Sequence, residues 1–376
     1  MEYIQDRIVS FLTANHFRSI PLVNLITKDQ HLFFTNSATC AYMSYIKNGS
    51  CVHEKLYCIQ PSLRNHNLKL YSEYSKNNQQ LSHFSFFHQL GLLETGRLGS
   101  DSILLVIQLL VEVLELRSEE VIIILPADYA QFSSLFTENF SARNIKVTTN
   151  KHMTTWNYGD ASLLGQSIVF CTIDPSSKRL INICDLVEIH NQSADFSVWE
   201  FCISIEFIEK ILNQYTSILQ ISNYRYLFDQ PLAWNNTYTL PLEIFGDAFH
   251  AYLQIMKHYH NFRLTGSLNN SQLSVLRKYF KYFWVYSRQC GMHEEELYTF
   301  VEHYIEDKAV CSFITDDIAK RARTLYCHEQ QYERLLLTTP NPLQAMEQAG
   351  RQLGLLQAQI EGIHKKLEIN VGGRLS

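Results

Sequence analysis

The hydrophobic pattern of this chain changes once, between two prolines, and that change limits the folds it can adopt. Before Pro231, short apolar runs of strand length are separated by long polar connections. After Pro241, apolar residues recur at helical spacing. The first part lacks the regular alternation of strands and helices that builds a parallel sheet. We therefore predict an α+β fold, an antiparallel sheet flanked by helices, followed by an all-α domain.

The first part contains one segment that is almost entirely β-branched, Val121–Leu125, which indicates a buried strand. The polar stretch Pro61–Leu81 is expected to be a long loop. Further strands are predicted at 32–35, 57–60, 84–90, 167–173 and 180–189, and helices at 4–14, 102–117 and 204–215.

The second part is predicted to form helices at 243–261, 271–290, 294–305 and 316–335, and a last helix over 342–368. Along this last helix, apolar residues alternate in steps of three and four, which suits packing against another helix. Two partners stay open: a helix of the same chain, or a second copy or partner protein. The seam consists of Met346, Ala349, Leu353, Leu356, Ile360, Ile363 and Leu367.

Composition excludes several classes of protein. With 376 residues, of which 46% are hydrophobic, the chain can bury two ordinary cores. Nine cysteines include no C-x-x-C pair, so we expect reduced thiols and no metal cluster. The longest apolar run, Ile103–Val111, is interrupted by Gln108 and is too short for a membrane span. We expect a soluble, cytoplasmic protein.

The net charge of −5 argues against general polyanion binding, yet one stretch reverses it. From Ala248 to Met292 there is no Asp or Glu. If this stretch is helical, the side chains of Arg277, Lys281 and Arg288 point in directions within about 40° of one another. This pattern predicts an RNA-contacting helix, and the alternative is an ordinary solvated face. The candidate tRNA-binding residues are Arg277, Lys278, Lys281 and Arg288.

Six short segments, in the right order, resemble alanyl-tRNA synthetase, a class II aminoacyl-tRNA synthetase. They span roughly residues 4–292. The segments are Leu32-Phe33-Phe34-Thr35-Asn36-Ser37-Ala38, Cys58-Ile59-Gln60-Pro61, His83-Phe84-Ser85-Phe86-Phe87-His88-Gln89-Leu90-Gly91, Trp156-Asn157-Tyr158-Gly159-Asp160, Glu188-Ile189-His190-Asn191 and Val275-Leu276-Arg277-Lys278.

The resemblance implies a class II synthetase-like catalytic core at 1–232, a helical tRNA-recognition-like domain at 233–340, and a heptad helix with a tail at 341–376. It implies tRNA and a small amino acid such as alanine as partners, and ATP with Mg²⁺ as the family's cofactor. The family's editing domain and zinc cluster have no counterpart, so no deacylase activity is expected.

Several residues that the family uses for ATP are replaced. Phe87 and His83 keep the second half of the ATP motif, where the phenylalanine lies against adenine. Gln60 stands where the family has the arginine for the α-phosphate, Arg64 stands at a loop lysine, and Lys210 replaces the third-motif arginine. A neutral amide cannot neutralise the charge that develops during phosphoryl attack. The resemblance therefore implies a degraded ATP site.

The amino-acid side of the pocket is better matched. Trp156 and Asn191 correspond to residues that wall the family's pocket. The aspartate that binds the substrate ammonium falls near Ile203, and Glu206 is the candidate to replace it.

Three functions follow from these observations, and whether the chain is an enzyme stays open. The first is a synthetase paralogue that binds a small amino acid or aminoacyl group and tRNA without efficient activation. The second is an active ATP-dependent ligase or aminoacyl transferase. The third is a non-catalytic subunit that assembles through 342–368. Loss of the arginine at Gln60 favours the first.

Overall fold

The computed structural model describes residues 2–27, 33–48, 54–77, 81–140, 144–150, 154–158, 162–175, 177–227, 239–263, 266–339, 341, 344 and 348–367. The chain divides into two compact units. The first unit comprises residues 1–64 and 80–225, and the second comprises 65–79 and 226–376.

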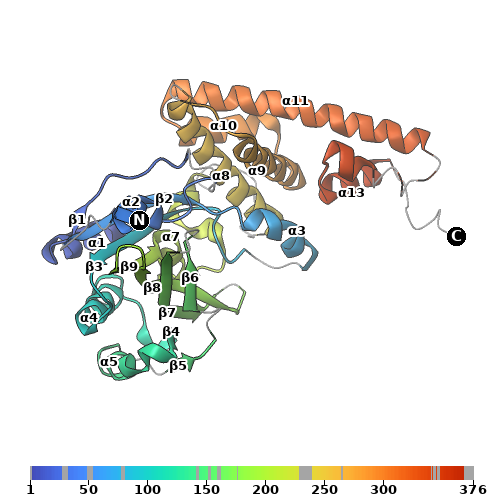
Figure 1. The fold of residues 1–376 in the computed structure, drawn as a ribbon. Coiled ribbons are helices and arrows are strands. Elements are labelled where there is room, and N and C mark those ends of the chain that lie inside the picture. Colours follow the sequence, from blue (N-terminus) through green and yellow to red (C-terminus); the bar gives the residue numbers. More distant parts are fainter. Residues whose placement is uncertain are drawn as a thin grey trace. The chain divides into compact units, whose positions relative to one another are not determined.

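The first unit is built on a nine-stranded sheet with the order β1-β2-β3-β9-β8-β7-β4-β5, in which β6 pairs with β7 (Figure 1). The pairs from β2 through β4 along this order are antiparallel, which confirms the predicted α+β architecture. The outer pairs β1–β2 and β4–β5 are parallel. The strands are β1 (Arg18–Ser19), β2 (Lys55–Leu63), β3 (Phe86–Thr95), β4 (Ile122–Pro126), β5 (Asn144–Thr148), β6 (Thr155–Asn157), β7 (Leu163–Ile173), β8 (Leu180–Asn191) and β9 (Phe196–Ser204).

Helices flank this sheet, and one of them, α4, passes from an α-helix into a π-helical turn. The predicted helix over 102–117 is α-helical only to Gln108 and continues as a π-turn at Leu109–Val113. The strand β9 runs directly into α7, which lies within the helix predicted over 204–215. The helices of this unit are α1 (Glu2–Ala14), α2 (Thr39–Asn48), α4 (Ser100–Gln108), α5 (Ser133–Asn139) and α7 (Ile205–Leu212).

The hairpin of β2 and β3 sets which side chains share a face of the sheet. Phe87 lies opposite Ser62, and Gly91 lies opposite Cys58 on β2 and Cys202 on β9. Because strand side chains alternate, Phe87, Gly91 and Cys202 belong to one face. We call it the α2 face, since α2 packs on it.

Close packing of α2 on the sheet depends on Gly91. The hydroxyl of Tyr42 donates a hydrogen bond of 2.6 Å to the Gly91 carbonyl. A Cβ at Gly91 would lie 2.4 Å from the Cβ of Ala38. The sheet and the helix can approach this closely only because position 91 has no side chain.

The second unit is helical, as predicted, with an aromatic core. Phe249 of α8 lies edge-on to Phe283 of α9, with ring centroids 5.1 Å apart. A buried Asp247 on α8 accepts hydrogen bonds from Asn67 and Tyr71 of α3. The helices are α3 (Asn67–Asn77), α8 (Leu240–Phe262), α9 (Asn270–Gln289), α10 (Glu294–Tyr304), α11 (Lys308–Thr338) and α13 (Gln357–Lys366), with a π-turn at Ala349–Leu353.

The predicted loop over Pro61–Leu81 is wrong. Strand β2 continues through Pro61. No described strand pairs with its outer edge there, so the missing N–H costs little. Residues 67–77 form α3, which buries Leu68, Tyr71 and Tyr74. The predicted strand at Leu32–Thr35 is also absent over its described residues, 33–35; Leu32 lies outside them.

The single helix predicted over 342–368 is broken. After the π-turn, Gly354 adopts a left-handed conformation with φ of +58° and α13 begins at Gln357. Met346 and residues 368–376 lie outside the described part. The seam packs against α11 of the same chain, where the buried members are Tyr332, Leu336, Ala349, Leu353, Leu355, Ile360 and Ile363.

Within the described residues, none of the helices is both long enough and apolar enough to span a bilayer.

Gly91→Ala should lower the free energy of unfolding by about 1–3 kcal/mol, because the added methyl collides with Ala38. Chemical denaturation measures this change. Ala38→Gly in the same chain should restore part of the loss, since it removes the colliding atom. Gly99→Ala is the matched control, because a Cβ there meets nothing within 4 Å. Equal stability of the Gly91 and Gly99 variants would contradict the packing.

Candidate functional site

Two carboxylates lie next to each other on the α2 face of the sheet. Asp185 of β8 is paired with Cys202, and Glu200 precedes Cys202 by two residues on β9. Alternation therefore directs Glu200, Cys202 and Asp185 to the same side. We call Glu200 and Asp185 the acid pair.

Glu200 is the more deeply buried member, with only 2% of its surface exposed. The side chains of Thr39 and Tyr158 hydrogen-bond to it, and the thiol of Cys202 lies 3.3 Å from its Oε1. Burial raises the pKa of Glu200 to about 7, and the hydrogen bonds offset part of that rise. At neutral pH its charge therefore depends on what lies beside it.

An irregularity in β8 brings Asn182 to the same face as Asp185. The pairing of β7 with β8 shifts register between Phe170 and Cys171, which skips Ile183. As a result the amide of Asn182 reaches both carboxylate oxygens of Asp185, at 3.1 and 3.0 Å. Burial raises the pKa of Asp185 to about 6, while the Asn182 hydrogen bond and the positive charge of Arg64 act in the opposite direction.

The ring of Tyr158 reaches Glu200 because Gly165 leaves room for it. A Cβ at Gly165 would lie 2.8 Å from the Tyr158 ring. Trp156 is paired with Gly165 on the short strand β6 and is 40% exposed. It lies at the open edge of the sheet, so Tyr158, rather than Trp156, contacts the acid pair.

Arg64 and Phe87 come together beside the acid pair. The guanidinium of Arg64 lies 5.1 Å from the centroid of the Phe87 ring, within cation–π distance. Phe87 is 4% exposed, whereas Arg64 is exposed. The arginine thus covers the face of the Phe87 ring to which the sequence resemblance assigned adenine.

Gln60 and Asn191 are both buried and engaged with the backbone. The Gln60 amide accepts from the Val23 N–H at 3.0 Å and donates to the carbonyls of Val23 and Pro61, at 2.9 Å each. Asn191 donates to the Ile46 carbonyl at the end of α2 and accepts from the N–H of Ser193. Both side chains stabilise chain segments here, which differs from the ligand-facing roles expected of them.

Glu206 lies on the other face of the sheet from the acid pair. It is fully buried in the first turn of α7, where both of its oxygens bond to His88, at 2.7 and 2.8 Å. Asn223 donates a further bond of 2.7 Å. His88 alternates with Phe87 along β3, so Glu206 and Phe87 are on opposite sides. This buried position differs from the ammonium-binding role expected of Glu206.

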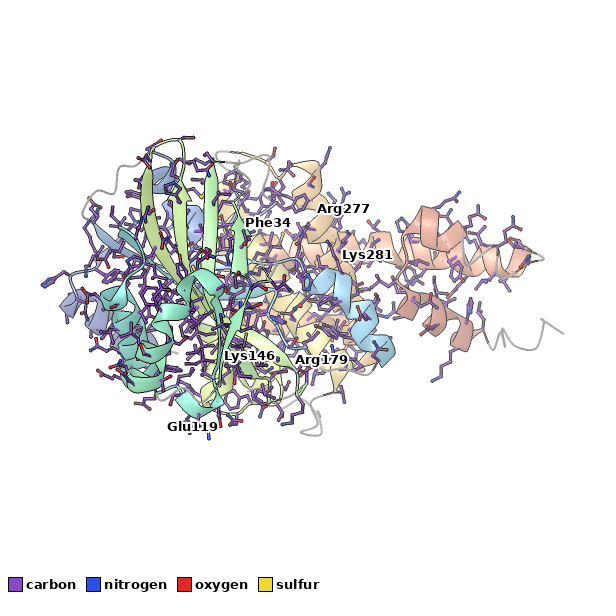
Figure 2. All side chains as sticks on the ribbon, turned by 60° about the horizontal axis from the view of Figure 1, so that its bottom comes forward. Phe34, Glu119, Lys146, Arg179, Arg277 and Lys281 are labelled. Atoms are coloured by element: carbon purple, nitrogen blue, oxygen red, sulfur yellow. The ribbon has the colours of Figure 1, made fainter. Side chains whose placement is uncertain are left out.

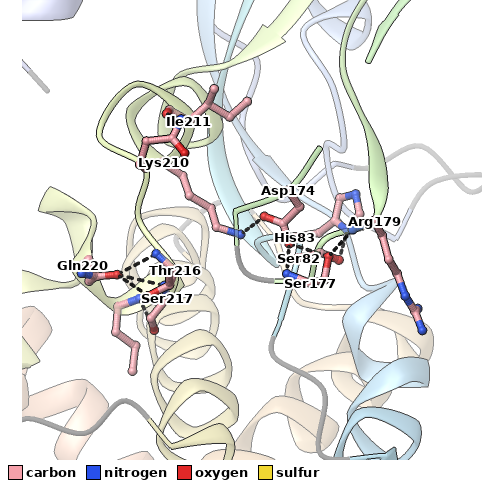
Figure 3. Close-up of polar contacts among 12 residues, drawn as sticks. Ser82, His83, Asp174, Ser177, Arg179, Lys210, Ile211, Thr216, Ser217 and Gln220 are labelled. Carbon is pink, nitrogen blue, oxygen red and sulfur yellow. Dashed lines mark hydrogen bonds and ion pairs between the residues drawn. The ribbon is translucent and has the colours of Figure 1, made fainter. Parts of the chain in front are cut away.

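Lys210 is held in a buried ion pair (Figure 3). Its Nζ lies 2.6 Å from Oδ1 of Asp174, and neither side chain is exposed to solvent. His83 is exposed, bonds to Ser82 and stacks on Phe207 of α7 at 6.2 Å. Four of the five proposed ATP-handling residues therefore separate into two groups. Arg64 and Phe87 meet on the α2 face, whereas His83 packs against α7 and Lys210 belongs to it.

The predicted basic face lies along α9 of the second unit, where Figure 2 marks Arg277 and Lys281 on the same helix. Arg277 and Lys278 are exposed. Lys281 is half-buried and donates to the carbonyl of Gly354 at 2.6 Å. Arg288 forms an ion pair of 2.9 Å with Glu329.

Metal and thiol chemistry find little support in this part of the chain. No group of three or more His, Cys, Asp or Glu side chains is placed to bind a metal among the described residues. Every described cysteine is a free thiol. Burial raises the pKa of Cys58 to about 12, which keeps it protonated and unreactive.

Sequence reasoning missed Glu200, Asp185 and Tyr158. One signal for Glu200 was present, because it is an acidic residue inside the apolar run Val198–Ile203. A carboxylate in the centre of a buried strand needs specific partners. Those partners, Thr39 and Tyr158, are too far away in sequence to be recognised.

Comparison with known proteins gives a likeness of fold at low identity. No protein-family model and no curated protein matches the sequence. Similar solved structures include histidyl-tRNA synthetase of S. aureus, with 12% identity, a TM-score of 0.40, and 59% of this chain and 68% of that chain covered. Asparaginyl-tRNA synthetase of Entamoeba histolytica, in complex with asparaginyl-adenylate, has 11% identity, a TM-score of 0.39, and coverage of 59% and 65%. Pyrrolysyl-tRNA synthetase of Desulfitobacterium hafniense has 11% identity, a TM-score of 0.36, and coverage of 58% and 71%.

These three proteins are class II synthetases, and the likeness concerns the fold alone. None of the three is named for alanine, so they give no support to the alanine-specific part of the sequence resemblance.

Stability should fall as pH rises from about 5 to 7. The folded-state pKa of Glu200 exceeds its unfolded value, so the folded chain retains a proton that the unfolded chain has released. The slope should reach about 1.4 kcal/mol per pH unit for one such group. Denaturation at several pH values measures it. Glu200→Gln should remove the slope between pH 6 and 7, where Asp185, with a pKa of about 6, contributes little. The exposed Glu138→Gln is the control, and identical slopes in both variants would contradict the assignment.

Proposed function

We propose that this chain is a class II synthetase-like protein that binds a small amino acid or aminoacyl group on the α2 face and tRNA on α9, without efficient activation by ATP. The observation that carries the proposal is the charge arrangement around the acid pair. Carboxylates lie on the sheet face, and the cation Arg64 lies close enough to Asp185 to lower its pKa.

This arrangement is complementary to an amino acid. A substrate ammonium would restore the charge of Glu200, whose pKa near 7 reflects burial beside other acidic groups. Arg64 would pair with a carboxylate or with the carbonyl of an aminoacyl ester. Tyr158 occupies the space above Gly165, which favours a small side chain such as that of alanine.

Loss of ATP activation is supported by the internal partners of the phosphate-binding candidates. Lys210 is neutralised by Asp174 in a fully buried pair, and Gln60 is bonded to the backbone of Val23. Arg64 covers Phe87, where adenine would stack. Removing a single preorganised charge contact costs on the order of 10²–10³ in rate, so two such changes leave little activity.

Binding of tRNA is supported by the exposed cations Arg277 and Lys278 on a helix within the acid-free stretch 248–292. Cations on a helix displace counterions from phosphates, which gives affinity without sequence specificity.

An active ligase using ATP and Mg²⁺ is the second candidate. Arg64 favours it, because this cation is exposed beside Phe87 and could turn toward a phosphate. Amino-acid-dependent ATP–pyrophosphate exchange separates the two candidates.

We expect no exchange above background with alanine, glycine or serine, with or without tRNA, because Lys210 and Gln60 are engaged internally. A catalytically competent alanyl-tRNA synthetase is the positive control. Robust alanine-dependent exchange would overturn the proposed loss of activation and establish the ligase.

Glu200→Gln should weaken binding of alanine, or of a non-hydrolysable aminoacyl analogue, by at least about tenfold, because the ammonium loses its charged partner. Isothermal calorimetry at pH 8 measures the affinity, since Glu200 is then deprotonated. Glu138→Gln, an exposed carboxylate of α5, should bind like the wild type. Unchanged affinity in Glu200→Gln would remove the acid pair from the site.

A further inference from the structure

The last described segment of the chain, Ala349–Leu367, contacts both α9 and α11 of its own unit. We call this segment the C-terminal cover. Figure 1 shows its helix α13 beside α11. Its apolar side packs on Tyr332 and Leu336 of α11. Its polar contacts reach the basic face of α9.

The first polar contact involves Lys281. Its Nζ donates to the Gly354 carbonyl at 2.6 Å, at the point where the cover turns through its left-handed glycine. Burial lowers the pKa of Lys281, and the neighbouring charges of Arg277 and Lys278 lower it further. The cover thus leaves the Lys281 ammonium half-buried beside the positive charges of Arg277 and Lys278, with the neutral Gly354 carbonyl as its partner. An anion would be a better partner for that cation.

The second contact is a shared carboxylate on α11. Glu329 accepts from Arg288 of α9 at 3.1 and 2.9 Å, and from the amide of Gln359 in the cover at 2.9 Å. The cover is therefore linked to both basic side chains at positions 281 and 288.

The cover packs on α11 but leaves a groove beside it. A groove of about 400 Å³ lies between α9, α11 and α13, and a Cβ at Gly362 on its wall would meet nothing within 4 Å. The helix α13 has 10 residues, and an isolated helix of that length is marginal in water. A π-turn and a left-handed residue interrupt the segment before it.

We infer that the C-terminal cover competes with RNA for the basic face of α9. In the covered state Lys281 is bound to Gly354, and Arg277 and Lys278 provide the exposed charge. In the uncovered state Lys281 joins them, and the face gains a phosphate contact. This inference rests on the proposed binding of tRNA by α9.

The test uses full-length variants and labelled, unfractionated tRNA in filter binding over a range of salt concentrations. Ile360→Ser with Ile363→Ser weakens the seam, since both residues are buried against α11. We expect affinity to rise about three- to tenfold, with a steeper dependence on salt, because one more cation meets the phosphates. Leu337→Ser, a 74% exposed position on α11, is the matched control and should bind like the wild type.

Two further variants act independently of the stability of the seam. Gly362→Leu should fill the groove, hold the cover in place and lower affinity at least about threefold. Lys281→Met should have little effect in the wild type but should abolish the gain in the Ile360/Ile363 variant. Hydrogen exchange should show faster exchange in 349–367 and unchanged protection in α8.

The outcomes separate the inference from the function on which it rests. If the wild type binds tRNA, and the uncovered variant binds equally although 349–367 exchanges faster, the competition is excluded and RNA binding stands. A Gly362→Leu chain with unchanged affinity also counts against the cover. If neither the wild type nor any variant binds tRNA, the proposed RNA function itself fails.

Discussion

The alternation of side chains along the central antiparallel strands is the constraint on which the rest of this structure depends. Because Gly91 is paired with both Cys58 and Cys202, the acid pair and Phe87 share one face while Glu206 and His88 share the other. A slip of one residue would exchange the two sets. The contact between Ala38 and the bare backbone of Gly91 opposes such a slip, so packing and register stabilise each other.

The distribution of partners among the charged groups separates structural from ligand-binding roles. Lys210 and Asp174 neutralise each other inside the protein, and removing either would leave an uncompensated buried charge. The acid pair accepts hydrogen bonds from Thr39, Tyr158 and Asn182. Among the described groups that shift the pKa values of Glu200 and Asp185, Arg64 is the only cation. Perturbed pKa values of this kind cluster at functional sites, which supports the proposed ligand-binding role of the acid pair.

Much of the fold was predictable because its signals are local. The β-branched run of β4 and the helical spacing of α8 and α9 need no distant information. Helix α3 was missed because its polar sequence contains only three residues that become buried. The break at Gly354 was missed because the apolar spacing of the seam continues on both sides of it. The hydrophobic pattern also predicted a strand over 84–90 and a helix over 204–215, close to β3 and α7. It could not show that Lys210 meets Asp174, since that partner lies 36 residues away in sequence.

Gly165 has a consequence for what the α2 face can admit. The ring of Tyr158 occupies the space that a side chain at position 165 would take. In the proposed amino-acid site, selection between large and small ligands would reside in the uncharged pair of Gly165 and Tyr158, whereas recognition of the ammonium would reside in the carboxylates of the acid pair. Ligand size and ligand polarity could therefore change independently in related sequences.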